Sequence, residues 1–324
     1  MNDSPFYSTL APFLKDFIEQ KHLLGFKYET EEHVLRTLDR YWAERNNTCS
    51  VTEKSLSGWL RKKETESVAS RSSRVSVLRQ FSLYLNGIGE AAYIPMDPYV
   101  KNHPVFHVLT PKEIQELFYA IDTYVPRRPQ SPDVMRVIQE YKILFRLILT
   151  TGLRKSEALG IRIEDLDLDG KTVAIFQAKM RRDRIVYFSS DMADLLRDCY
   201  LPFLRREIGH EPIWLFPSVN PDKHMSGGCS EKFRDFWNTT QSAAHCAKRP
   251  TIHSLRHTYV VMRMNFWMEN GYDLRVMMPY LSRQLGHVSV DETFYYYHQV
   301  VDAHRIIQQK DTLASSVIPE VRVR

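Results

Sequence analysis

Residues 134–151 form the segment that most constrains the fold. They make a long, nearly continuous apolar stretch that ends at Gly152. A helix that is apolar on nearly all sides is normally buried, so we expect this one at the centre of a domain. Arg154 and Glu157 follow its end directly. A structural arginine paired with a glutamate is the common explanation, but a turn at the end of a rigid helix is also where a phosphate could be bound.

A proline-rich stretch at residues 95–109 divides the chain. Before it, apolar residues at helical spacing predict four short helices in a small bundle. After it, Thr110, Pro111 and Glu113 give a strong helix start. The length of 324 residues is enough for two hydrophobic cores. We therefore expect the following parts: a helical domain at residues 1–98, a linker at 99–109, a second domain at 110–298 and a C-terminal segment at 299–324.

The apolar pattern changes from helical to alternating at Asp165. Asp169-Gly170 favours a hairpin turn, and residues 172–177 and 184–188 predict strands. The predicted fold class is therefore mainly α with a small antiparallel β-sheet in the second domain.

The loop between the last two strands carries Lys179 at its tip. A lysine at a hairpin tip is usually just exposed to solvent. It could instead reach a phosphodiester as a mobile proton donor, with Arg181 and Arg182 binding the DNA backbone nearby.

The distribution of basic residues favours a polyanionic partner. The net charge of +5 is a moderate excess that many enzymes share. Clusters at 61–63, 71–79 and 179–184 lie in different predicted elements, which favours nucleic acid over three unrelated solvated faces. The first two clusters fall on the third and fourth predicted helices, so these helices are expected to contact DNA through Lys62, Lys63, Arg71, Arg74 and Arg79.

Other features exclude several classes of protein. No apolar run reaches the length of about eighteen residues that suggests a membrane span, and the N-terminus lacks the pattern of a signal peptide. The four cysteines show no C-x-x-C spacing and no disulfide framework. We expect a soluble, cytoplasmic protein that has no membrane partner.

Reactive side chains are concentrated near the C-terminus. His253 and Arg256 are three residues apart, so on a helix both point to the same side, where they could hold an anionic oxygen and accept a proton. Gly286 predicts a helix end directly before His287. Nine residues further stands Tyr296, the middle one of three tyrosines, whose hydroxyl could act as a nucleophile. Taken alone, the three tyrosines favour amphipathic packing.

Collected in order, these motifs resemble those of the tyrosine recombinase (phage integrase) family. The motifs that carry the resemblance are Thr151-Gly-Leu-Arg154-Lys-Ser-Glu157, His253-x-x-Arg256-His257, Leu285-Gly-His287 and Tyr296-Tyr297-His298. The resemblance covers essentially the whole chain, because the helical front half also resembles the family's core-binding domain. It implies a simple recombinase of Xer or Cre type without a separate arm-binding domain.

For the arginines, the resemblance implies phosphate binding. Arg154 and Arg256 would hold the nonbridging oxygens of the scissile phosphate. Glu157 would orient the first arginine. No metal or other cofactor is implied, because arginines, a lysine and histidines supply the positive charge.

The remaining residues would carry the covalent chemistry. The resemblance implies that Tyr296 attacks in line to give a 3′-phosphotyrosyl link, while Lys179 protonates the leaving 5′ oxygen. His253 would be the general base, and His287 would donate a further hydrogen bond to the phosphate.

The same resemblance implies partners. These are double-stranded DNA with an inverted-repeat core site and a homotetramer that passes through a Holliday junction, or a heterotetramer with a related recombinase. An accessory protein is left open. The segment at 300–313 would either dock on a neighbouring subunit or pack as a terminal helix on its own subunit. The expected outcome is integration, excision or resolution of a mobile element or replicon.

Several alternatives stay open. The chain could be a non-cleaving DNA-binding accessory protein of the same fold or a type IB topoisomerase. His253 and His257 could bind zinc in a hydrolase, although the glutamate that would follow the first histidine is missing. Tyr295 and Tyr297 compete with Tyr296 as the nucleophile.

Overall fold

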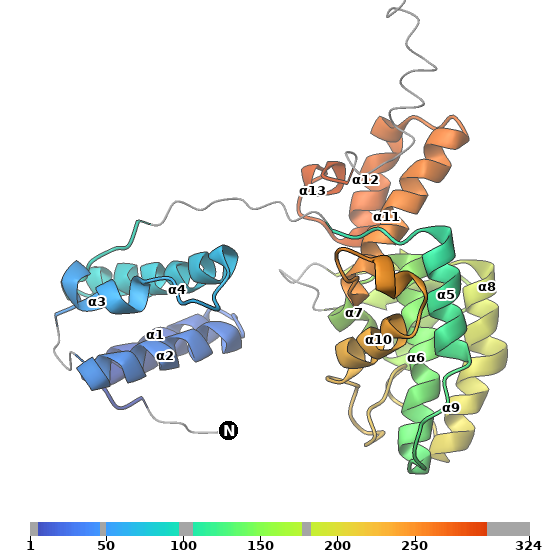
Figure 1. Cartoon of the computed structure of the whole chain (residues 1–324), viewed down its shortest axis with the longest axis horizontal. Coiled ribbons are helices and arrows are strands. Elements are labelled where there is room, and N and C mark those ends of the chain that lie inside the picture. Colours follow the sequence, from blue (N-terminus) through green and yellow to red (C-terminus); the bar gives the residue numbers. More distant parts are fainter. Residues whose placement is uncertain (1–5, 46–49, 97–105, 177–182, 297–324) are drawn as a thin grey trace, which may run out of the picture. The chain divides into compact units, whose positions relative to one another are not determined.

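The computed structural model describes residues 6–45, 50–96, 106–176 and 183–296. The chain forms two compact units, residues 1–104 and residues 105–324 (Figure 1). Within the described ranges, no helix combines the length and the apolar character needed to cross a lipid bilayer.

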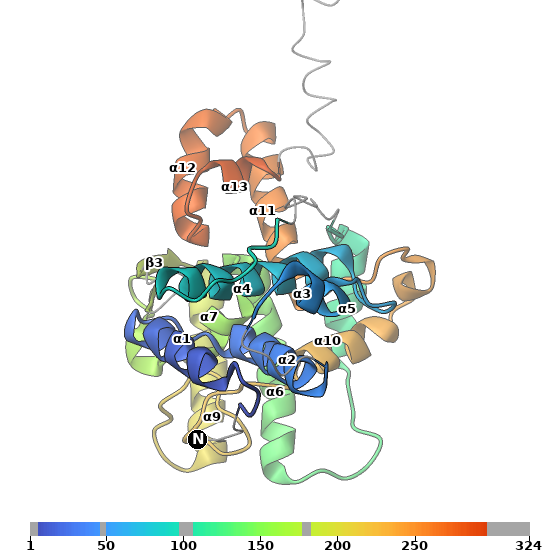
Figure 2. The same cartoon turned by 90° about the vertical axis from the view of Figure 1, so that its left-hand side faces the viewer.

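The first unit is a small helical bundle. Its helices are α1 (Ala11–Leu23), α2 (Glu29–Arg45), α3 (Glu53–Leu60) and α4 (Val68–Gly87). Helices α1 and α2 form one layer, and α3 and α4 form the other (Figure 2). The apolar residues that recur at helical spacing meet between the layers, where Leu14, Trp42, Leu56 and Phe81 are fully buried. The four helices expected from the sequence are therefore confirmed.

The basic residues of this unit are placed differently from the prediction. Arg74 is buried in α4, and its guanidinium donates to the Glu66 carboxylate at 2.8 Å and to the carbonyl of Trp59. Hydrogen bonding from Arg74 lowers the pKa of Glu66 to about 2. The expected contact of Arg74 with DNA is wrong, because the side chain is buried and its guanidinium is bonded to Glu66. Lys62 and Lys63 follow the end of α3 and do not lie on it.

Two other arginines of α4 also have partners within the unit. Arg71 donates to the carbonyl of Leu60 at 3.0 Å, and Arg79 donates to the carbonyl of Pro95 at 3.2 Å. DNA contact by Arg71 and Arg79 stays a prediction.

The second unit contains most of the helices and the sheet. Its elements are α5 (Pro111–Asp122), α6 (Pro132–Thr151), α7 (Lys155–Leu159), η1 (Ile163–Asp165), β1 (Leu166–Asp167), β2 (Thr172–Ile175), β3 (Arg184–Tyr187), α8 (Ser190–Asp194), η2 (Leu195–Tyr200), α9 (Leu201–Ile208), α10 (Cys229–Asn238), η3 (Ser242–His245), α11 (Ile252–Glu269), α12 (Leu274–Leu285) and α13 (Asp291–Phe294).

The sheet is antiparallel with strand order β1-β2-β3. Val173 of β2 pairs with Val186 of β3, and both side chains are buried in the core. Together with the helices, this sheet confirms the predicted fold class, mainly α with a small antiparallel β-sheet.

Helix α6 is the buried helix that the sequence predicts, and it packs against α11. It ends at Gly152, which has a φ of 71°. A Cβ at this position would lie 2.5 Å from a ring carbon of Tyr259 in α11 and 2.8 Å from a methyl group of Leu285 in α12. Only glycine fits both the left-handed backbone and this crowding. The C-terminal ends of α6 and α12 are thereby brought together against α11.

Candidate active site

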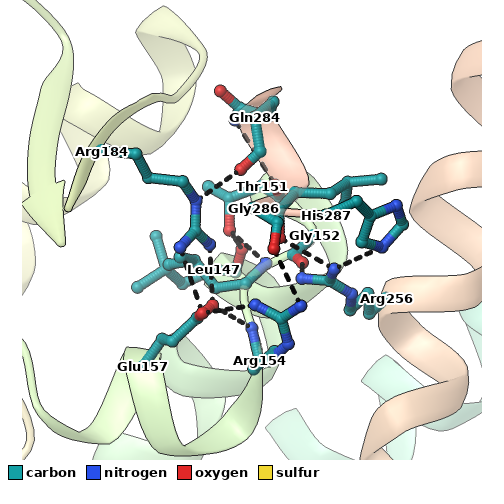
Figure 3. Close-up of polar contacts among 12 residues, drawn as sticks. Leu147, Thr151, Gly152, Arg154, Glu157, Arg184, Arg256, Gln284, Gly286 and His287 are labelled. Atoms are coloured by element: carbon teal, nitrogen blue, oxygen red, sulfur yellow. Dashed lines mark hydrogen bonds and ion pairs between the residues drawn. The ribbon is translucent and has the colours of Figure 1, made fainter. Parts of the chain in front are cut away.

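Arg256 lies at the meeting point of these helix ends. Its side chain is 1% exposed. Nη1 donates to the carbonyl of Gly152 at 2.6 Å, and Nη2 donates to the carbonyl of Leu285 at 2.9 Å (Figure 3). Helix C-terminal carbonyls carry partial negative charge, so the buried cation is stabilised there. Burial and the charge of Arg154 lower its pKa to about 10, which leaves it protonated at neutral pH.

Arg154 and Glu157 form a second part of the site. The glutamate closes the first turn of α7, since Oε2 accepts from the backbone N–H of Arg154 at 2.8 Å. Its other oxygen accepts from Nη1 of Arg154 at 2.8 Å, and Nη2 of the same arginine donates to the carbonyl of Gly286 at 3.1 Å. The guanidinium is therefore fixed between α7 and the end of α12, with 22% of its side chain exposed.

Arg184 is a further member of this network, and the sequence motifs do not include it. It approaches Glu157 through both Nη atoms, at 3.1 and 2.8 Å, and its Nε donates to the carbonyl of Gln284 at 2.9 Å (Figure 3). Burial raises the pKa of Glu157, but hydrogen bonds and charge from Arg184 and Arg154 more than offset it, so the pKa lies below its usual value. The strand pattern could have indicated this position, because residues two apart in a strand lie on the same face and Arg184 therefore shares a face with the buried Val186.

Gly286 allows this approach. It caps α12 with a φ of 65°, and a Cβ there would lie 2.7 Å from a guanidinium nitrogen of Arg184. The turn expected at residues 285–287 is confirmed, with an additional steric reason for glycine.

His287 follows this turn and contacts Arg256. Its Nε2 lies 2.9 Å from Nη2 of Arg256, and its Nδ1 lies 2.6 Å from Oγ1 of Thr293. Because an arginine only donates, Nε2 accepts here and the ring proton sits on Nδ1, which donates to Thr293. Burial and the nearby arginines lower the pKa of His287 to about 3. In this arrangement Nε2 is an acceptor, whereas the prediction is that His287 donates to a phosphate.

Tyr296 lies beside His257 and His287 and is 5% exposed. Its hydroxyl is 2.9 Å from Nδ1 of His257. His257 stacks on Phe106 with ring centroids 3.9 Å apart, and this stacking restrains the orientation of its imidazole. Burial raises the pKa of Tyr296, while Arg256 opposes that rise by charge and hydrogen bonding. The tyrosine is thus a protonated phenol next to a buried cation.

His253 lies one turn before His257 on α11, with ring centroids 4.4 Å apart. Its side chain is exposed, as is needed for contact with a ligand. Surrounding protein and the positive charges of Arg256 and Arg154 lower its pKa. Across the described part of the chain, no third metal-ligating side chain joins His253 and His257, so these residues supply no ligand set for a zinc hydrolase.

The remaining predicted residues of the site lie outside the described residues. These are Lys179, Arg181 and Arg182 in the predicted hairpin loop, and Tyr297 and His298 after Tyr296. Their roles stay predictions.

The charges at this site suit an anion. Arg154, Arg184 and Arg256 contribute three positive charges and Glu157 one negative charge, which leaves a net charge of +2. The contacts of Arg256 to Gly152, Leu285 and His287 use three of its five N–H groups, and it also bonds to the hydroxyl of Tyr296. A tetrahedral phosphate could accept from the remaining ones and from Arg154, with the hydroxyl of Tyr296 beside it.

The chain belongs to the phage integrase family, whose model matches residues 107–303. It is 27% identical over 241 residues to tyrosine recombinase XerD of Lacticaseibacillus casei, covering 72% of this chain and 74% of that protein. It is 24% identical over 308 residues to XerD of Chlorobaculum tepidum, covering 91% and 93%. The family predicted from the sequence motifs is thereby confirmed.

A solved structure shares the fold. The XerH site-specific recombinase bound to its difH substrate, in a pre-cleavage complex, aligns with a TM-score of 0.61. The alignment covers 94% of this chain and 82% of that chain at 20% sequence identity.

Proposed function

We propose that this protein is a site-specific DNA recombinase in which Tyr296 cleaves DNA through a 3′-phosphotyrosyl intermediate. The observation that carries the proposal is the position of the Tyr296 hydroxyl, which bonds to His257 and lies within the field of Arg256. Membership of the phage integrase family supports the reaction class.

In the proposed reaction, the phosphate binds between the two motif arginines. Arg154 and Arg256 donate to its nonbridging oxygens and stabilise the charge that develops in the transition state. Glu157 and helix-end carbonyls orient these guanidiniums before DNA binds. Two fixed guanidiniums can supply the charge that a metal ion supplies in other phosphoryl transfers.

Proton transfers complete the step. The oxygen of Tyr296 forms a bond to phosphorus as its proton leaves to His253, the predicted general base. The bond to the 5′ oxygen breaks, and Lys179 supplies the proton of the 5′ hydroxyl. For His287 to donate to the phosphate, Arg256 must release Nε2 and that nitrogen must gain a proton. The phosphotyrosyl bond retains the energy of the phosphodiester, so rejoining needs no ATP.

The wider assignment rests on the family. We infer a double-stranded DNA partner with an inverted-repeat core site, a tetramer that passes through a Holliday junction, and action on a mobile element or replicon in the cytoplasm. The helical unit would be the core-binding domain, contacting DNA through Lys62, Lys63, Arg71 and Arg79. The segment at 299–324 would dock on a neighbouring subunit.

A covalent-trapping selection tests this function even though the target sequence is not specified. The full chain is incubated in EDTA with nicked duplexes whose inverted-repeat arms are randomised, and protein–DNA adducts that survive denaturant are recovered and sequenced. We expect an enriched inverted repeat with the wild type and with Tyr295→Phe, and none with Tyr296→Phe.

Two results would count against the proposal. An adduct that persists in Tyr296→Phe moves the nucleophile to another tyrosine. Sequence-selective binding of DNA without any adduct, by wild type and variants alike, favours the non-cleaving accessory protein.

A further inference from the structure

A second cluster of chemically active side chains lies in the second unit, residues 105–324, here called the catalytic unit. It includes none of Arg154, Arg184 and Arg256. His107 precedes α5, Glu113 lies in its first turn, and Cys246 follows η3. One donor atom from each lies within 4.8 Å of the others. The side chains of His107 and Glu113 are 22% and 11% exposed, so the cluster is mostly withdrawn from solvent.

We propose that His107, Glu113 and Cys246 bind a zinc ion that holds together two distant parts of the catalytic unit. Sγ of Cys246 lies 3.7 Å from Nδ1 of His107. In a tetrahedral zinc site, a sulfur and a nitrogen ligand are about 3.5 Å apart. An imidazole binds one ion through one nitrogen, whereas Cys246 faces Nδ1 and Glu113 faces Nε2, so closing the cluster around an ion requires the His107 ring or the Glu113 carboxylate to reorient within the 4.8 Å that separates the donor atoms.

The two oxygens of Glu113 have separate tasks. Oε2 accepts from the backbone N–H of Thr110 at 2.7 Å and so completes the capping box of α5. Oε1 faces Nε2 of His107 at 2.9 Å. The helix cap consequently places Oε1 in the cluster, where it pairs with His107 and would have to exchange this contact for a metal.

The donor set favours zinc over harder cations. A thiolate, an imidazole and a carboxylate together match zinc, whereas Mg²⁺ and Ca²⁺ prefer oxygen alone. Once the thiol has lost its proton to solvent, the ligands carry two negative charges, which a divalent ion balances. Lys112 and Lys248 line the adjoining pocket, so binding of a cation depends on both negative ligands being present.

An open coordination position faces this pocket, whose volume is about 640 Å³. A water molecule or the side chain of His245, which also lines the pocket, would complete four ligands. The ion would join the segment before α5 to the loop before α11, two stretches 139 residues apart in sequence. Phe106, next to His107, stacks on His257, so the bound ion would stiffen the support of the nucleophile without taking part in the chemistry.

Metal binding is measured on the full chain after stripping with EDTA and dialysis. Titration with ZnCl₂ in a calorimeter is expected to give one ion per chain. Titration with CoCl₂ is expected to give a thiolate-to-cobalt charge-transfer band in the near ultraviolet and the intense visible bands of tetrahedral cobalt. Neither readout depends on recombination, so failure here and failure of the proposed function are distinguishable.

Matched variants assign the ligands. Cys246→Ser and His107→Ala should abolish the thiolate band or the stoichiometric binding, and Glu113→Gln should weaken binding at least tenfold while keeping the helix cap. Cys199→Ser, which removes an exposed thiol elsewhere, should bind like the wild type. Circular dichroism verifies that each variant is folded.

Three results would overturn the proposal. These are an absence of stoichiometric zinc in the folded wild type, a cobalt spectrum without a thiolate band, and unchanged binding in Cys246→Ser. Zinc is also expected to raise the melting temperature of the wild type by several degrees and to leave that of Cys246→Ser unchanged.

Discussion

The hydroxyl of Tyr296 lies 2.9 Å from Nδ1 of His257. His257 is the residue directly after the motif arginine Arg256, and its ring lies flat on Phe106 with planes 14° apart. The imidazole therefore cannot turn freely, and its hydrogen bond fixes the direction of the phenol. We regard His257 as a positioning residue for the nucleophile.

Replacement of His257 by phenylalanine should keep the stacking on Phe106 and remove the hydrogen bond. We expect the single-turnover rate of DNA cleavage to fall by about 10²-fold, while the dissociation constant for DNA stays unchanged. His210→Phe is the control, because His210 is exposed and bonds only to a backbone carbonyl. Equal cleavage rates in His257→Phe and wild type would show that this contact is incidental.

Arg184 should matter for stability because it neutralises a buried carboxylate. Its pair with Glu157 is 6% and 4% exposed, and removal of one partner from a buried pair costs about 3 kcal/mol or more. Arg184→Met is expected to lower the free energy of unfolding by about that amount in urea denaturation.

The matched control for Arg184 is Arg197→Met. Arg197 pairs with Asp169 and Asp194, and all three side chains are at least 40% exposed. Exposed pairs contribute about 0–1 kcal/mol. A loss in Arg184→Met no larger than in Arg197→Met would contradict the structural role of the buried pair.

Gly286 is predicted to be intolerant of any side chain. Gly286→Ala adds left-handed strain of about 1–2 kcal/mol and a clash with the fixed guanidinium of Arg184. Gly209→Ala introduces only the strain, since Gly209 has a φ of 82° and nothing lies within 4 Å of its Cβ position. Chemical denaturation should therefore show the larger loss for Gly286→Ala. Equal losses in the two variants would mean that Arg184 moves aside at little cost.

The buried histidines predict a pH dependence of stability. Burial, followed by neighbouring positive charges, lowers the pKa of His257 and of His287 from 6.5 to about 3. Between these values the unfolded chain binds protons that the folded chain does not. The contribution of these two rings to the free energy of unfolding should therefore be constant above about pH 6.5 and fall as the pH drops toward about 3, by at most about 1.4 kcal/mol per pH unit for each ring.

Urea denaturation at about pH 7 and about pH 5 measures this slope. His257→Gln should reduce the difference between the two conditions, whereas replacement of the exposed His210 by glutamine should leave it unchanged. An undiminished difference in His257→Gln would place the titrating group elsewhere.

Much of the site can be predicted because its signals are local. The end of α6 at Gly152, the capping box of Thr110 and Glu113, and the turn at Gly286 each depend on residues a few positions apart. The pairing of Arg154 with Glu157 likewise follows from their spacing.

Long-range contacts explain what the sequence does not reveal. Arg184 reaches Glu157 across 27 positions, and only the folded sheet places it there. The basic character of its helix predicts that Arg74 contacts DNA, but the side chain is buried and bonds to the carboxylate of Glu66, eight residues earlier. The bond of His257 to Tyr296 spans 39 positions, so no local pattern indicates that this histidine contacts the proposed nucleophile.

Identifying the tyrosine that becomes linked to DNA tests most directly whether Tyr296 is the nucleophile. The trapped adduct is digested with nuclease and trypsin, and the peptide spanning residues 284–305 is sequenced by tandem mass spectrometry. We expect a nucleotide phosphate on Tyr296. A nucleotide on Tyr295 or Tyr297, or on a residue outside this peptide, would contradict it.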